Sequence, residues 1–97
     1  MFKATKEQIA EWKEKHKKVF CIKVDDKACY LKKPSRQALG YSVIAGKDNP
    51  IKANEVLLND CWLGGDEDIK TDDDLFFAVS RRITELIEAK EAELEKL

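Results

Sequence analysis

The alternating stretch Val19–Leu31 constrains the fold of this chain more than any other segment. Phe20, Ile22 and Val24 recur at every second position, and a second short apolar run follows Asp25-Asp26-Lys27. A period of two on either side of a polar turn predicts a β-hairpin. An isolated hairpin is at best marginally stable in water, so its apolar side must pack on helices. The chain is therefore predicted to form an α+β fold.

The expected register of this hairpin follows from its apolar residues. A two-residue turn at Asp26-Lys27 pairs Val24 with Cys29 and Ile22 with Leu31. This pairing collects all four side chains on one buried face of the hairpin.

The cysteines are predicted to be free thiols. Cys21, Cys29 and Cys61 are odd in number and follow no C-x-x-C spacing, which argues against a disulfide framework and against a zinc site. The hairpin register also places Cys21 and Cys29 on opposite faces, where disulfide geometry cannot be met. Free cysteines behave as small hydrophobic residues, so we expect buried thiols.

Four helices are predicted from capping signals and helical periodicity. The expected starts are the capping box Thr5-Lys6-Glu7-Gln8, then Pro34-Ser35, then Asn49-Pro50, and last Thr71 with the carboxylates of 72–74. The second helix carries Leu39, Val43 and Ile44, although Gly40 inside it costs about 1 kcal/mol relative to Ala. Gly64-Gly65 is expected to end the third helix, because glycine readily adopts the left-handed termination.

The last helix is predicted to be long and to project beyond the core. Its apolar stripe runs to Ile87 and then thins to Ala89, Leu94 and Leu97 among charged residues. The expected architecture is thus an N-terminal helix, a β-hairpin and three helices with a long C-terminal helix, in a single domain over residues 1–97.

The charge of the chain is divided along the sequence. Residues 1–36 carry eleven Lys/Arg and five Asp/Glu, whereas residues 37–97 carry seven and fourteen. Two halves whose opposite net charges nearly cancel are typical of a protein that associates with a partner or with itself. The attraction between such halves weakens as salt screens it. We expect weak head-to-tail self-association that declines with salt.

No sequence motif indicates a catalytic site or a metal-binding site. His16, the only histidine, has no motif partner, so no triad or metal site can be argued. The acidic stretch 66–74 fails the calcium-loop spacing, because its sixth position is Thr71 rather than Gly and the twelfth is Phe77 rather than Glu. No enzyme, cofactor or metal is expected. Because no bilayer-spanning run or signal peptide is visible, we expect a cytoplasmic protein with no membrane partner.

A basic N-terminal region offers an alternative function. Cations interleaved with aromatic residues can contact phosphates while a ring stacks on a base. The candidate nucleic-acid-binding residues are Lys13, Lys17, Lys18, Lys23, Lys32, Lys33 and Arg36. They are mostly lysines on both sides of a helix and hairpin, in a net acidic chain, which favours protein binding over this alternative.

Four segments carry a resemblance to small phage or prophage proteins of the tail assembly chaperone type. They are Val19–Leu31, Lys33–Arg36, Asn54–Glu67 and Glu88–Leu94, and the most distinctive is the Leu-Asn-Asp-Cys-Trp-Leu-Gly-Gly-Asp segment at 58–66. The resemblance implies a non-enzymatic protein that coats the tape-measure protein and recruits tail-tube subunits in the bacterial host cell. It carries over no catalytic residues.

The partner-binding residues are predicted from exposed apolar positions near the ends of helices. Leu94 and Leu97 sit at helical spacing beyond the apparent core, and Trp62-Leu63 precedes the glycine pair. Leu94, Leu97 and any exposed part of Trp62-Leu63 are expected to bind an extended helical partner. The alternative is that Trp62 lies wholly in the core and that the terminal helix frays.

Overall fold

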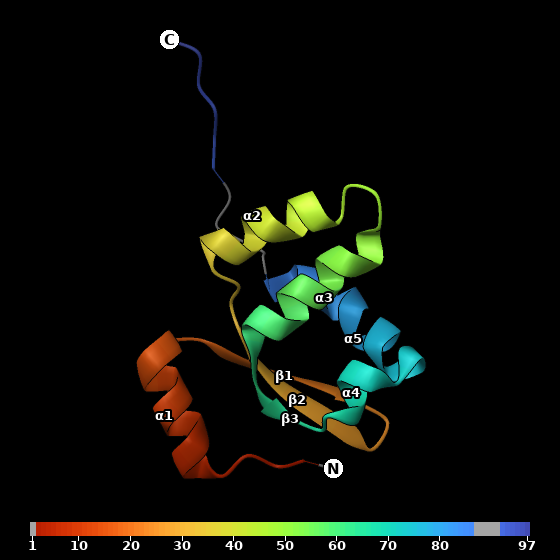
Figure 1. Ribbon diagram of the computed structural model, residues 1–97. Helices are drawn as coiled ribbons and strands as arrows, with labels where there is room; N and C mark the ends of the chain where they lie inside the picture. The colour runs from red at the N-terminus through yellow and green to blue at the C-terminus, as the bar shows by residue number, and fades with distance from the viewer. Residues whose placement is uncertain (1, 87–91) are drawn as a thin grey trace.

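A three-stranded antiparallel sheet and five helices make up the part of the chain that the structure, a computed structural model, describes: residues 2–86 and 92–97 (Figure 1). The elements in chain order are α1 (Lys6–His16), β1 (Val19–Val24), β2 (Lys27–Lys32), α2 (Arg36–Ala45), α3 (Pro50–Cys61), β3 (Trp62–Gly65), α4 (Asp68–Thr71) and α5 (Asp73–Leu86). The predicted α+β fold is confirmed.

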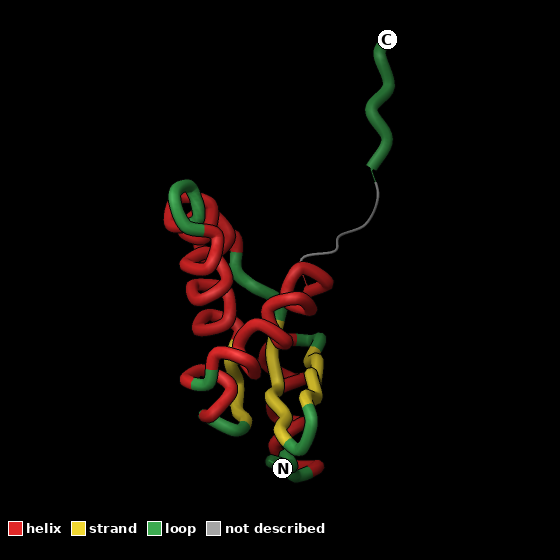
Figure 2. Tube along the Cα trace, turned by 90° about the vertical axis from the view of Figure 1, so that its right-hand side faces the viewer, coloured by secondary structure: helices red, strands yellow, loops and turns green. Residues whose placement is uncertain are grey.

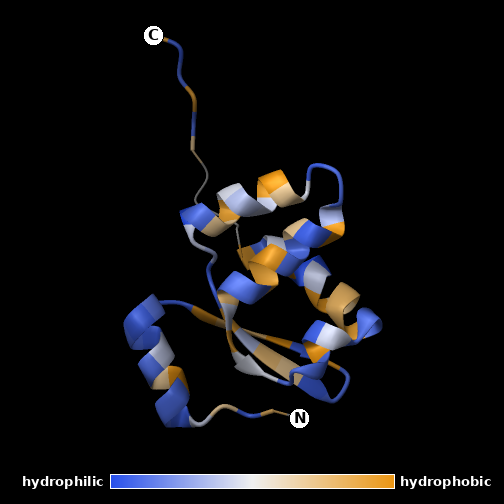
Figure 3. Ribbon diagram, viewed as in Figure 1, coloured by the Kyte–Doolittle hydropathy of each residue, from blue (hydrophilic) through white to orange (hydrophobic). Residues whose placement is uncertain are grey.

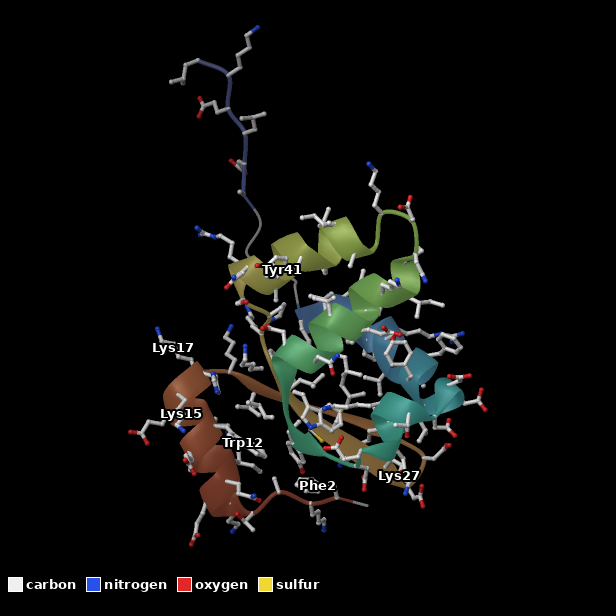
Figure 4. The ribbon with its side chains drawn as sticks, in the orientation of Figure 1. Phe2, Trp12, Lys15, Lys17, Lys27 and Tyr41 are labelled. Atoms are coloured by element: carbon white, nitrogen blue, oxygen red, sulfur yellow. The ribbon has the colours of Figure 1, made fainter. Side chains whose placement is uncertain are left out.

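The sheet has the order β1-β2-β3 and separates a large core from a small aromatic cluster. Helices α3, α4 and α5 cover one face, and α2 packs outside them on α3 (Figures 1 and 2). Their core closes over Cys29 and Leu31 of β2, which are fully buried. On the opposite face α1 places Trp12 against Tyr30, with ring centroids 5.6 Å apart. Figure 4 labels Trp12 on this helix.

Three helix starts form as their capping residues predict. Thr5 and Gln8 make both hydrogen bonds of the capping box at α1. The Ser35 hydroxyl accepts the N–H of Ala38 at α2, and the Asn49 side chain accepts the N–H of Ile51 at α3. These local interactions satisfy N–H groups that have no partner within the helix.

The hairpin register differs from the expected one by two residues. The turn lies at Asp25-Asp26, so Ile22 pairs with Cys29 and Phe20 with Leu31. A shift of two residues preserves the faces, because side chains alternate with a period of two. Cys21 and Cys29 therefore lie on opposite faces as predicted, but Cys21 is exposed rather than buried.

The segment at Trp62–Gly65 was predicted wrongly as the end of a helix. Helix α3 ends at Cys61, and Trp62–Gly65 forms β3, antiparallel to β2. Gly65 has a φ of 152°, and a β-carbon there would lie 2.6 Å from the Cα of Cys29. The glycine is thus needed for close approach of two strands and not for helix termination.

The start of α5 and the C-terminal segment also differ from expectation. Thr71 belongs to α4, and Asp72 caps α5 by accepting the N–H of Leu75. Helix α5 ends at Leu86 among the described residues, and residues 92–97 form no helix. The expected helical stripe at Ile87 and Ala89 lies outside the described residues.

Asp66 joins three distant parts of the chain. Its carboxylate accepts the backbone N–H groups of Phe2 and Ala28, each at 2.9 Å, and its own N–H donates to the Ala28 carbonyl. The N–H groups of Phe2 and Ala28 hold the pKa of Asp66 below its ordinary value, because they stabilise the ionised carboxylate. The N-terminal segment is thereby fixed beside β2 and β3.

We expect Asp66→Asn to destabilise the fold at neutral pH. A carboxyl group with a lowered pKa in the folded state stabilises it above the ordinary pKa, and this contribution is lost as pH falls through the folded pKa. The difference in free energy of unfolding between the wild type and Asp66→Asn should be largest near pH 7 and vanish in acid. Urea denaturation at several pH values measures it. Asp48→Asn, at an exposed loop position, is the control, and an equal loss from both variants would contradict the role of Asp66.

The thiols should differ in reactivity. Cys29 and Cys61 are buried, and burial raises their pKa to about 12 and about 11, whereas Cys21 is exposed. Titration with a thiol reagent should find one reactive group in the native protein and three after denaturation without reductant. A native count of zero or a denatured count of one would contradict this assignment.

Candidate protein-binding surfaces

Helix α2 is held at its start by the end of α3. The Asp60 carboxylate accepts the N–H of Ser35 at 3.1 Å and lies 3.5 Å from the Lys32 ammonium. On the inner side of α2 the small residues Ala38 and Ser42 are buried, one helical turn apart. Small residues at this spacing let the helix lie close to its neighbour α3.

The outer side of α2 exposes large hydrophobic residues. Figure 3 colours part of this helix as hydrophobic, and Figure 4 labels Tyr41 on it. Val43 is 74% exposed, Ile44 73% and Tyr41 58%. Gly40 lies on the same side one turn earlier, and a β-carbon there would meet nothing within 4 Å. No packing among residues 2–86 and 92–97 requires that glycine. We call Gly40, Tyr41, Val43 and Ile44 the α2 face. A cluster of large exposed hydrophobic residues marks an interaction site more often than a single exposed hydrophobic residue does.

Positive charge borders the α2 face. Residues 32–47 carry Lys32, Lys33, Arg36 and Lys47 and no Asp or Glu. Lys33, Arg36 and Lys47 are exposed, whereas Lys32 is paired with Asp60. An apolar centre with a basic margin suits an acidic amphipathic partner.

The predicted partner-binding residues lie in two different settings. Leu94 and Leu97 are fully exposed in residues 92–97, which extend away from the rest of the protein (Figures 1 and 2). Trp62 and Leu63 are half-buried in β3; the Trp62 ring packs on the core and lies 4.3 Å below the Lys70 ammonium. The structure does not bring the two pairs together as one surface.

A groove of about 570 Å³ is lined by residues of β1 and α5. Its apolar wall includes Phe20, Ile22 and Leu86, and Arg82 and Glu85 form an ion pair of 2.7 Å at its border. The apolar residues of β1 are half-buried, because α5 covers them only in part. The sequence predicted a fully buried face for Ile22 and Val24, which are only half-buried.

The candidate nucleic-acid-binding lysines are only partly brought together. Val19 pairs with Lys32, so Lys18 and Lys33 adjoin at one end of the hairpin, near Lys17 at the end of α1. The remaining candidates are dispersed: Lys23 lies toward the other end of β1, and Lys13 and Arg36 lie on separate helices. Trp12 and Tyr30 pack against each other at an interplanar angle of 39°, so these rings are engaged within the fold.

No metal centre is found within residues 2–86 and 92–97, where no three His, Cys, Asp or Glu side chains are grouped to hold an ion. None of the described helices is long and apolar enough to cross a membrane. Comparisons with known protein families, curated proteins and solved structures found no match to this chain.

Two glycine substitutions test the description of α2. Gly40→Ala should raise the free energy of unfolding by about 0.5–1 kcal/mol, because the helix gains a better helix former whose β-carbon meets no neighbour. Gly46→Ala should instead destabilise, since its β-carbon would lie 2.7 Å from that of Ala53. Thermal or urea denaturation compares the two. Destabilisation by Gly40→Ala would show that the α2 face is covered within the monomer.

Proposed function

We propose that this chain is a non-enzymatic assembly protein of the tail assembly chaperone type, which binds tape-measure and tail-tube proteins in the bacterial cytoplasm. The observation that carries a binding role is the α2 face. Val43 and Ile44 are both more than two-thirds exposed although the other side of the same helix packs on α3. Burial of each of these side chains by a partner would contribute roughly 1.5–3 kcal/mol to the free energy of binding.

The form of the α2 face favours a helical partner. Helix-in-groove recognition uses apolar anchors separated by three or four residues, and Gly40, Val43 and Ile44 have that spacing. A glycine among them lets the backbone of another helix approach closely. The basic margin then favours acidic residues beside the apolar stripe of the partner.

The C-terminal leucines supply a second contact in this proposal. Leu94 and Leu97 are exposed in full, and their i, i+3 spacing places them on one side of a helix if binding orders the segment. Ordering on contact costs conformational entropy, so this contact should contribute less than the α2 face.

Co-expression with the tape-measure protein of the same locus tests the proposal. We expect Val43→Gln/Ile44→Gln to reduce recovery of soluble complex strongly, because it removes apolar area from the α2 face while leaving the core intact. Truncation after Lys90 should give a smaller loss. Phe77→Gln, on α5, is the matched control for removal of an exposed apolar side chain elsewhere.

The outcomes separate the two contacts and the alternative function. Equal recovery from the intact and truncated chains would remove Leu94 and Leu97 from the mechanism. Equal recovery from the wild type and Val43→Gln/Ile44→Gln would contradict the role of the α2 face. Tight nucleic-acid binding without any protein complex would replace this proposal with the basic-region alternative.

A further inference from the structure

The two edges of the sheet are protected very differently. Strand β3 has four residues, its register with β2 shifts at Tyr30/Leu31, and Trp12 and Phe2 pack on its face, within 4 Å of the β-carbon position of Gly64. Strand β1 has six residues in unbroken register, and no strand within residues 2–86 and 92–97 pairs with its outer edge. Short, irregular and covered edges resist strand addition, whereas long regular ones invite it.

The backbone of β1 presents pairing groups along this open edge. In an antiparallel hairpin with a two-residue turn, the residues that flank the turn face each other through hydrogen bonds, and alternate residues then face outward. With Val24 opposite Lys27, the outward positions are Val19, Cys21 and Lys23. Cys21 and Lys23 are exposed, and both line the groove beside α5.

The charges that flank β1 are complementary to those of a second copy running in the opposite direction. Lys17 and Lys18 precede the strand, and Asp25 and Asp26 follow it. Figure 4 shows Lys17 and Lys27 at opposite ends of the hairpin, so the basic end is distant from the turn that carries Asp25 and Asp26. Lys27, beside that turn, is paired with the Asp68 carboxylate at 3.2 Å. Antiparallel pairing of two copies places each basic end beside an acidic turn, whereas parallel pairing would place like charges together.

We propose that β1 pairs antiparallel with β1 of a second copy of this chain, which joins the two sheets about a two-fold axis. The register centred on Ile22 brings Ile22 against its counterpart and Phe20 against Val24 of the second copy. These side chains all lie on the groove side and fill the space beside α5 from both copies. Lys18 then faces Asp26 of the second copy. Lys23, the only charge within β1, lies on the other face of the sheet with Cys21.

This contact differs from the head-to-tail association expected from the charge halves of the sequence. The same strand serves both copies, so the contact is isologous and closes at a dimer. It leaves the α2 face and residues 92–97 free for the partner of the proposed function.

Charge exchange tests the pairing in the full chain. Lys18→Glu and Asp26→Lys should each weaken dimerisation about tenfold, because each turns both symmetric attractions into repulsions. An equimolar mixture of the two variants should restore a heterodimer, since the contacts between unlike copies are again attractive. Sedimentation at several concentrations measures all four samples, and circular dichroism confirms that each variant is folded.

Amide hydrogen exchange provides a second measurement that does not depend on substitution. The N–H groups of Cys21 and Lys23 should exchange more slowly as concentration rises, whereas that of Ile22 should be protected at every concentration. A wild type that stays monomeric at millimolar concentration, a dimer insensitive to both substitutions, or a mixture that fails to associate would each overturn the proposal.

Discussion

The fold depends on the return of the chain at Trp62–Gly65 to the free side of β2. In a two-stranded hairpin the outer edge of each strand is unpaired, and β3 converts β2 into a central strand whose residues Cys29 and Leu31 are fully buried. Gly65 permits this approach, because any side chain there would collide with the Cys29 backbone. The Asp66 carboxylate then binds β2 and the N-terminal segment together. Both faces of the sheet are organised around this one junction.

The same junction leaves the molecule with unequal surfaces. Strand β3 is short and Trp12 and Phe2 pack on its face, while no strand of the described residues pairs with the β1 edge beside the groove. Helix α2 lies outside the core and packs on α3 through the small residues Ala38 and Ser42. Its other side exposes Val43 and Ile44. An isologous contact at β1 and a helical partner at α2 would use separate surfaces, so an assembling protein could engage both at once.

Much of the fold could be predicted because its signals are local. Thr5, Ser35 and Asn49 cap their helices through hydrogen bonds that reach only two or three residues, and these starts were predicted correctly. The candidate site was predicted less well. Leu94 and Leu97 are exposed as expected, but the face of α2 could not be assigned from its apolar residues, since packing on α3 selects Ala38 and Ser42 for burial. The presence of two small residues one turn apart was the available signal.

The sequence by itself determined the α+β class, three helix starts and the separation of Cys21 from Cys29, because capping and side-chain alternation act over a few residues. Only the tertiary structure decided that Trp62–Gly65 is a strand, that Ile69 of the acidic segment is fully buried and that Asp66 bridges to Phe2. These features arise from contacts between residues far apart in the chain. Their energies depend on which surfaces meet, and no local pattern contains that information.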